Sequence, residues 1–308
     1  MILITGSTGF IGQYVTRRLL AEGYSVRLLC RDTGMAGAMF PSAEAVKGDV
    51  LDVESLRAAM KGVTKVIHLA GVVSFSLPRY ELFLINYGGT RNVLEASKNV
   101  DKLLFSSSVS VYGDTPSVAD ESFPTNPNTD YGLSKLEAEK AAFYSGIPTI
   151  AYRIGPVYGI GSPVWSEVLR FLEKKYPIPN VRTMTNLVHV SDVSRAFLLG
   201  LNKGKLTGIY NITGEKPLPF LDFARLLCYY LPVRPRVLPA PLVMLVARLL
   251  GKRRYFNALC MNRLYDCSKA KRELGFSEEA DLDGETRKMV EWYKSHRAGV
   301  TKYAGDMA

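Results

Sequence analysis

The sequence is short of the residues that build disulfide frameworks and metal centres. It contains four cysteines among 308 residues, none in a CxxC spacing, and three histidines scattered along the chain. Isolated cysteines are typical of free thiols in a reducing cytoplasm. Three scattered histidines are too few to suggest a metal site. We therefore expect neither disulfide bonds nor a bound metal.

Long apolar runs are also missing. The longest, Leu242–Ala247, is far shorter than the roughly 20 residues that cross a bilayer. The first residues, Met1–Gly6, lack the basic region and apolar core of a signal peptide, and instead predict a strand that enters a turn. Low-complexity stretches and repeats of solenoid period are absent as well. These features predict a cytoplasmic protein.

Acidic residues are outnumbered, with 29 Asp and Glu against 39 Lys and Arg, and the net charge is +10. Such a charge favours nucleic acids, anionic membrane surfaces or phosphate-bearing ligands. The basic residues are spread along the chain, and no Lys/Arg run is interleaved with aromatic residues. We therefore expect no nucleic-acid partner.

Short apolar runs alternate with longer stretches of helical period in the first half of the chain. The predicted strands are Ile2–Thr5, Ser25–Cys30, Ala45–Lys47, Lys65–Leu69, Lys102–Ser107 and Pro148–Arg153. The predicted helices are Ile11–Glu22, Leu51–Lys61, Arg79–Asn99 and Tyr131–Tyr144. This alternation is typical of a parallel sheet with helices on both faces. We expect an α/β fold with a doubly wound parallel Rossmann sheet.

The composition of the sequence changes after about residue 155, where Pro and Gly become frequent and the alternation of strand and helix patterns stops. It returns over Leu187–Leu201 and Ile209–Ile212. We expect 1–155 plus about 186–212 to form the dinucleotide-binding Rossmann domain. About 156–185 plus 213–308 would form a smaller, mostly helical substrate lobe over the carboxyl ends of the strands.

Three glycines follow the first predicted strand at a regular spacing. Gly6 permits a tight turn, Gly9 lets a pyrophosphate approach the backbone, and Gly12 lets the next helix pack close to the strand. The helix that follows offers free N–H groups and a positive dipole end to phosphates. A glycine triplet between a strand and an amphipathic helix predicts dinucleotide binding.

The end of the second strand bears on the choice between NADP and NAD. A carboxylate at this point would accept hydrogen bonds from the adenosine ribose and repel a 2′-phosphate. Here the position holds Cys30, followed by Arg31 and Asp32. A guanidinium can bind a phosphate with two hydrogen bonds. We expect NADP through Arg31, with NAD as the alternative if Asp32 reaches the ribose.

Two further segments contain side chains that can transfer a proton or hold the substrate oxygen. Tyr131 and Lys135 lie four residues apart on a predicted helix, which stacks the phenol and the ammonium on one face. A nearby cation stabilises a phenolate and so makes a tyrosine usable as an acid or base. Ser106–Gly113 ends the fifth strand, where a hydroxyl can hold a substrate oxygen beside the tyrosine.

Together these segments resemble the extended short-chain dehydrogenases/reductases. This superfamily includes sugar-nucleotide epimerases and dehydratases, 3β-hydroxysteroid dehydrogenases and dihydroflavonol reductases. The resemblance is close over about 1–215 and looser beyond. Its motifs are Thr5–Gly12, Gly48–Val50, His68–Gly71, Asn86–Thr90, Ser106–Gly113, Tyr131–Lys135, Arg153–Gly159 and Val188–Val193.

The resemblance implies a role for individual residues. Ser108, Tyr131 and Lys135 would be catalytic, with Tyr131 as the general acid/base, and Ser107 is an open alternative to Ser108. Tyr131 and Lys135 would also contact the cofactor. The other implied cofactor-binding residues are Gly6, Thr8, Gly9, Phe10, Ile11, Gly12, Arg31, Asp49, Val50, Leu69, Ala70, Gly71, Ser106, Ile154 and Val157. Asn86 and His189 are expected to hold turns.

The substrate class divides between two branches of the family. Sugar-nucleotide members carry a glycine-rich stretch and a basic residue for the diphosphate after the turn at Arg153–Gly159. Gly161–Leu187 contains no such stretch, although the basic residue could be replaced by Arg170, Lys174, Lys175 or Arg182. Gly71–Ser76 and Leu238–Leu245 instead resemble the branch that acts on steroids, flavonoids and other lipophilic alcohols or ketones. We expect an oxidoreductase that transfers a hydride between a nicotinamide and a secondary alcohol or ketone, acting as a homodimer. The alternatives are a sugar-nucleotide epimerase or dehydratase and, in another class, a silent NAD(P)-binding sensor or scaffold.

One C-terminal segment has two interpretations. Leu242–Leu250 is apolar nearly all round, and Lys252, Arg253 and Arg254 follow it. It predicts either a helix buried in the second lobe or a helix that lies on an anionic membrane, with the basic trio on lipid headgroups. Peripheral membrane contact therefore stays open.

Overall fold

The computed structural model describes residues 1–74, 77–249, 251, 256–257 and 261–305. At its centre is a seven-stranded sheet in the order β11-β6-β5-β4-β1-β2-β3, in which all neighbours are parallel. Its strands are β1 (Ile2–Thr5), β2 (Val26–Cys30), β3 (Glu44–Lys47), β4 (Lys65–His68), β5 (Lys102–Ser108), β6 (Thr149–Ile154) and β11 (Gly208–Ile212). The strand order changes direction beside β1, so the predicted doubly wound Rossmann sheet is confirmed.

Helices cover both faces of this sheet because alternate strand residues are apolar toward each side. Ile2 and Ile4 pack in the hydrophobic cluster of α1 and α8, whereas Leu3 between them packs in the cluster of α3, α5 and α6. The helices of this part are α1 (Phe10–Ala21), α2 (Thr33–Met39), α3 (Val53–Ala59), α4 (Arg79–Phe83), η1 (Leu84–Gly88), α5 (Gly89–Ala96), η2 (Val109–Val111), α6 (Asp130–Tyr144) and α8 (Val190–Leu201). Strands covered on both faces explain the nearly continuous apolar runs in the sequence.

The segment that was expected to form one helix over Arg79–Asn99 contains a π-helical turn. This turn, η1, lies between α4 and α5. π turns inserted into α-helices often mark functional sites. Here the turn carries Asn86, which is buried with only 1% of its surface exposed.

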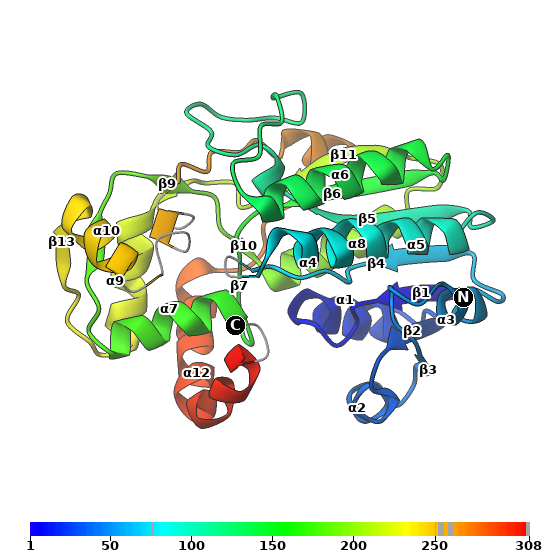
Figure 1. Ribbon diagram of the computed structural model, residues 1–308, viewed down its shortest axis with the longest axis horizontal. Coiled ribbons are helices and arrows are strands. Elements are labelled where there is room, and N and C mark those ends of the chain that lie inside the picture. Colours follow the sequence, from blue (N-terminus) through cyan, green and yellow to red (C-terminus); the bar gives the residue numbers. More distant parts are fainter. Residues whose placement is uncertain (75–76, 250, 252–255, 258–260, 306–308) are drawn as a thin grey trace.

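The remaining elements gather at the side of the molecule toward which the strands run, on the left of Figure 1. They are β7 (Val157–Tyr158), α7 (Pro163–Glu173), β8 (Ile178–Asn180), β9 (Met184–Thr185), β10 (Val188–His189), β12 (Leu218–Pro219), α9 (Phe220–Tyr230), β13 (Val237–Pro239), α10 (Ala240–Leu249) and α12 (Leu282–Gly305), with the exception of η3 (Ala270–Leu274), which packs against β11 and α8. Helices α7, α9 and α12 share a separate cluster, in which the rings of Trp165 and Phe223 meet edge-on at 4.7 Å. In the described ranges, no helix combines the length and the apolar content needed to cross a bilayer.

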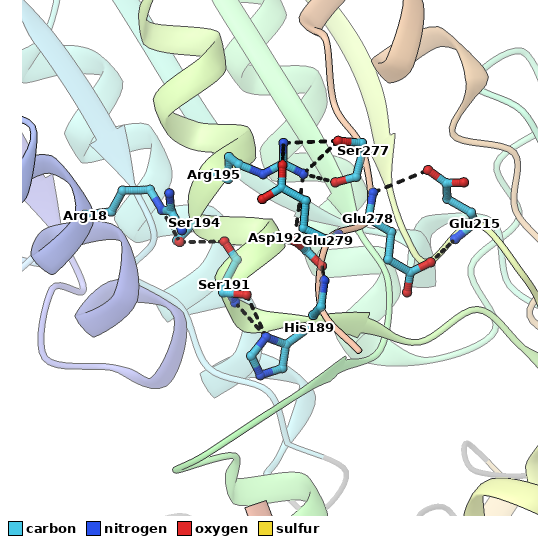
Figure 2. A network of polar contacts seen from close by, with 11 residues as sticks. Arg18, His189, Ser191, Asp192, Ser194, Arg195, Glu215, Ser277, Glu278 and Glu279 are labelled. Carbon is cyan, nitrogen blue, oxygen red and sulfur yellow. Dashed lines mark hydrogen bonds and ion pairs between the residues drawn. The ribbon is translucent and has the colours of Figure 1, made fainter. Parts of the chain in front are cut away.

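A polar network joins α8 to the segment that leads into α12 (Figure 2). The carboxylate of Asp192 on α8 accepts hydrogen bonds from the backbone N–H groups of Glu279 at 3.2 Å and Ala280 at 3.3 Å. Arg195, one turn further, forms an ion pair of 2.7 Å with Glu279. His189 caps the start of α8, which agrees with the prediction that it holds a turn. These contacts anchor the second group of helices to the sheet.

Candidate active site

The turn between β1 and α1 is a cradle that only glycine can form. Gly6 has a φ of +74°, and a Cβ there would lie 2.6 Å from the backbone nitrogen of Ala70. A Cβ on Gly12 would lie 2.0 Å from the carbonyl oxygen of Gly6. Helix α1 begins after Gly9 with no side-chain cap and no acidic residue in its first turn. Its N–H groups are therefore free for an anion, which fits the pyrophosphate of a nicotinamide dinucleotide.

The other expected cofactor residues lie along the same edge of the sheet. Strands β1 to β4 are parallel, so the residues that follow them meet at one edge. Arg31 follows β2 and Asp49 follows β3, while Leu69–Gly71 follows β4. Of the rest, Thr8, Phe10 and Ile11 are half-buried in the glycine turn, Val50 is buried beside Asp49, Ser106 is half-buried on β5, and Ile154 and Val157 flank the turn from β6 to β7.

Arg31 and Asp32 have different surroundings at the end of β2. The carboxylate of Asp32 caps α2, because it accepts a hydrogen bond from the backbone N–H of Met35 at 2.9 Å. The guanidinium of Arg31 is exposed, and it makes no hydrogen bond or ion pair with the described part of the chain. Arg31 is thus the group at this strand end that is available to a phosphate.

Asn86 connects the cofactor edge to helix α6. Its side-chain amide accepts a hydrogen bond from the backbone N–H of Val72 at 2.8 Å, and donates to the carbonyl of Val72 and the hydroxyl of Ser134, each at 3.0 Å. These are the contacts of a residue that holds a turn, as the sequence predicts. The segment beside Val72 is consequently held close to α6, since a Cβ on Gly71 would lie 3.9 Å from the Nζ of Lys135.

Tyr131 and Ser108 face each other at the carboxyl end of β5. Thr129 starts α6 by accepting a hydrogen bond from the backbone N–H of Gly132 at 3.0 Å, which places Tyr131 in the first turn. Burial raises the pKa of Tyr131 above its usual value, and the side-chain hydrogen bond with Ser108 acts in the opposite direction. A phenol and an alcohol in this arrangement can hold one substrate oxygen between them.

Ser107 points into a different environment from Ser108. Its hydroxyl donates a hydrogen bond of 2.5 Å to Oε2 of Glu139. Glu139 forms a buried ion pair with Arg153, with 2.6 Å between Nη2 and Oε1 and 3.1 Å between Nε and Oε2. Glu139 lies eight residues after Tyr131 on α6, so the serine that it holds is engaged away from Tyr131. The geometry favours Ser108 for the substrate oxygen.

Lys135 is buried between these groups and the cofactor edge. Its Nζ lies 4.6 Å from the centroid of the Phe105 ring and makes no hydrogen bond or ion pair within the described residues. Burial lowers the pKa of Lys135 to about 8, while the charge of Glu139 raises it in opposition. An ammonium with unused donors beside Gly71 can bind the hydroxyls of a ribose.

His68, on β4, is buried next to this site, and its imidazole is neutral at physiological pH. Its Nδ1 is 2.7 Å from the hydroxyl of Thr5, and its Nε2 is 2.9 Å from the hydroxyl of Thr90. Burial, with help from the positive charge of Lys135, lowers the pKa of His68 to about 3. Because both ring nitrogens are engaged, His68 links β1, β4 and α5 instead of taking part in proton transfer.

A cavity of about 810 Å³ opens beside Tyr131 and extends to the second group of helices. Its described lining comprises Ser74, Leu77, Arg79, Leu82, Asp114, Pro127, Asn128, Thr129, Asp130, Tyr131, Leu133, Val181, Thr183, Ala240, Met244, Asn257, Met261 and Asn262. Ala240 and Met244 belong to α10, so this helix forms a wall of the cavity. Among the described residues, no cluster of His, Cys, Asp and Glu could hold a metal ion.

Sequence reasoning did not single out Glu139. A signal was available, since Tyr131, Lys135 and Glu139 are spaced by four residues on one helix. This spacing alone does not show a role for Glu139, because its partner Arg153 lies on β6 and only the structure brings the two together. The residues of the second lobe that line the cavity carry no comparable signal, because they come from separate loops and from α10.

Comparison with known proteins places this site in a family. The model of the NAD dependent epimerase/dehydratase family matches residues 2–213. Sterol-4-alpha-carboxylate 3-dehydrogenase, decarboxylating, from Bos taurus is 28% identical over 71% of this chain and 67% of its own length. "Putative UDP-glucose 4-epimerase" from Methanocaldococcus jannaschii is 33% identical over 66% of this chain and 73% of its own length. The solved structure of MoeE5 in complex with UDP-glucose and NAD has the same fold, with a TM-score of 0.80 and 24% identity over 96% of this chain and 99% of that one.

The matched region contains the glycine turn, the end of β5 and helix α6. It therefore includes the cradle for a dinucleotide and the facing side chains of Tyr131 and Ser108. The chain belongs to the NAD dependent epimerase/dehydratase family and is a nicotinamide-dependent oxidoreductase of the extended short-chain dehydrogenase/reductase type.

Proposed function

We propose that the enzyme interconverts a secondary alcohol and a ketone, with Tyr131 as the general acid/base. The observation that carries this proposal is the pairing of Ser108 with Tyr131, which lines the cavity. When bound, the nicotinamide supplies the hydride donor or acceptor. During reduction, Tyr131 donates its hydroxyl proton to the carbonyl oxygen as the hydride reaches the carbonyl carbon, and during oxidation the phenolate takes the proton back.

Lys135 and Ser108 support this proton transfer in different ways. The ammonium of Lys135 stabilises the phenolate form of Tyr131 and binds the nicotinamide ribose. The hydroxyl of Ser108 orients the substrate oxygen toward Tyr131. Both roles are consistent with the burial of Lys135 beside Gly71 and with the hydrogen bonding between Ser108 and Tyr131.

The cofactor we propose is NADP. Arg31 is exposed at the end of β2 and has no partner in the described structure, whereas Asp32 is engaged in capping α2. A free guanidinium at this position favours the 2′-phosphate of NADP. NAD remains the alternative cofactor in the test below.

The lining of the cavity supports an alcohol or ketone over a sugar nucleotide. Among the described lining residues, Arg79 is the only cation, and its guanidinium lies 3.8 Å from the carboxylate of Asp130. Asp114 adds a second carboxylate. A diphosphate requires cationic partners, whereas Leu133 and Met244 suit an apolar substrate body.

The two parts of the chain would bind different ligands. In this proposal 1–155 plus about 186–212 bind the cofactor, and about 156–185 plus 213–308 form the substrate lobe. The cavity supports this division because it lies between α6 and α10. The three described cysteines, Cys30, Cys228 and Cys267, are buried free thiols, which supports a cytoplasmic location.

A homodimer is the assembly we propose. Tyr80 and Leu84, on α4 and η1, are 70% and 53% exposed, and Phe143 and Tyr144 at the end of α6 are 38% and 88% exposed. Exposed apolar side chains on neighbouring helices are typical of association surfaces. Sedimentation velocity of the wild type measures the assembly directly, and a single species of monomer mass would contradict it.

The test of the reaction is Tyr131→Phe, with Tyr144→Phe on the same helix as the matched control. Reduction of a 3-keto steroid or a flavonoid ketone by NADPH or NADH is followed by nicotinamide absorbance. Conversion of UDP-glucose, which consumes no net cofactor, is followed by chromatography of the sugar nucleotide in the presence of NAD or NADP. Loss of the phenolic proton should lower turnover by about 10²- to 10⁴-fold and leave cofactor affinity unchanged. Tyr144 lies at the opposite end of α6 from Tyr131, and phenylalanine keeps its ring in the proposed dimer surface, so its variant should match the wild type.

Each outcome separates the candidate functions. Near wild-type turnover by Tyr131→Phe would refute the proposed mechanism. Activity only toward UDP-glucose would favour the epimerase alternative. Cofactor binding without turnover of any of these substrates would favour a sensor or scaffold.

A further inference from the structure

Helix α10 presents two different faces. On the inner face, Val243 and Ala247 are each 2% exposed, and Met244 lines the cavity beside Tyr131. The outer face carries Leu242, Leu245, Val246 and Leu249, whose exposed fractions are 54%, 56%, 43% and 79%. Of the two interpretations of this segment, burial holds only for the inner face. The outer face is an apolar surface with no covering element in the described structure.

The surroundings of this face are strongly basic. Residues 223–265 contain no aspartate or glutamate and eight lysines or arginines, which accounts for +8 of the net charge of +10. Arg234, Arg236 and Arg248 are exposed, and their side chains make no hydrogen bond or ion pair within the described residues. Lys252, Arg253 and Arg254, which the membrane interpretation of the sequence puts on lipid headgroups, lie outside the described residues.

This combination restricts the partner. A second copy of the same surface would bring two carboxylate-free basic segments together, and like charges oppose such a contact. An anionic bilayer offers both complements at once: acyl chains for the leucines and phosphates for the arginines.

We propose that the outer face of α10 and the flanking arginines dock on an anionic lipid bilayer. Met244 lies on the opposite side of the same helix, so docking brings the cavity beside Tyr131 to the membrane surface. A lipophilic alcohol or ketone then enters the cavity from the bilayer without crossing water. This delivery step rests on the proposed function, whereas docking does not.

The test is co-sedimentation of the full-length protein with vesicles. The probes are phosphatidylserine/phosphatidylcholine vesicles and pure phosphatidylcholine vesicles, at low and high salt. The wild type should bind the anionic vesicles at low salt and be released by high salt. Replacing Arg234, Arg236 and Arg248 with glutamine should lower the partition coefficient on the order of a hundredfold.

Leu249→Glu probes the apolar contact, with Val118→Glu as its matched control. Val118 is 60% exposed on a loop that belongs neither to α10 nor to the segment of the flanking arginines, so its variant adds the same charge outside the proposed surface. Leu249→Glu should lose vesicle binding and Val118→Glu should keep it. Both positions are exposed, so both variants should retain the wild-type circular dichroism spectrum.

Two results would overturn the proposal. One is absence of the wild type from the anionic vesicle pellet at low salt. The other is a soluble oligomer that Leu249→Glu dissociates without lipid, which would assign the face to a second copy. Sedimentation requires no turnover, so failure of docking is distinguishable from failure of the reaction proposed for Tyr131.

Discussion

Replacing Glu139 with glutamine would remove one charge from a buried ion pair while keeping the shape of the side chain. Glu139 and Arg153 are 3% and 4% exposed, and the pair is held by hydrogen bonds of 2.6 and 3.1 Å. A guanidinium does not lose its proton in a protein, so Arg153 would remain charged and buried without a carboxylate beside it. Breaking a buried pair from one side costs about 3–5 kcal/mol of folding free energy.

The assay is urea denaturation with the free energy of unfolding extrapolated to water. The matched control is Glu95→Gln, which breaks the 2.8 Å ion pair with Arg57 in a site where both side chains are about half exposed. An exposed pair contributes about 0–1 kcal/mol, so the control should be nearly neutral. A double replacement, Glu139→Leu with Arg153→Met, should recover much of the loss because no charge is left buried.

The same variant has a second readout at the active site. The charge of Glu139 raises the pKa of Lys135, which burial brings to about 8. Glu139→Gln should lower this pKa further, so Lys135 loses its proton at a lower pH. The pH above which cofactor affinity falls should therefore be lower than in the wild type. A loss of unfolding free energy below about 1 kcal/mol would refute the energetic reasoning. An unchanged alkaline limb would refute the electrostatic link to Lys135.

Three further predictions concern the cofactor and the serines. Lys135→Met should weaken cofactor binding at neutral pH and abolish the fall in affinity expected of the wild type above about pH 8, because the ammonium that loses its proton there is gone. Fluorescence titration across pH measures this, and a wild-type affinity that is flat with pH would contradict it. Arg31→Ala should weaken NADP roughly ten- to hundredfold and NAD little, and equal affinity of the wild type for both would refute this role. Ser108→Ala should lower turnover about a hundredfold at nearly unchanged unfolding free energy, whereas Ser107→Ala should mainly lower stability, and the reverse pattern would exchange their roles.

Part of the site follows from local spacing and was predictable. Gly6 and Gly12 lie within one strand–turn–helix unit, and their function depends on backbone geometry over seven residues. Tyr131 and Lys135 share a helix face by periodicity alone. The site assignments themselves stay predictions until the variants above are measured.

Other features needed partners from distant parts of the chain. Ser107 and Ser108 both contact α6, Ser107 at Glu139 and Ser108 at Tyr131, so their roles depend on where the end of β5 lies along that helix. The π turn at Asn86 cannot be read from periodicity, since it adds only one residue to a helical turn. The cavity combines loops from both lobes with α10, and no local pattern indicates which loops meet.

The sequence by itself determined the alternation of strands and helices, the glycine turn after β1 and the spacing of Tyr131 and Lys135, because each depends on contacts within a few neighbouring residues. Only the tertiary structure decided that Glu139 pairs with Arg153, and that α10 leaves one apolar face exposed. The physical reason is burial. Whether a charge is compensated or an apolar side chain is covered depends on what packs against it, and those neighbours come from remote segments of the chain.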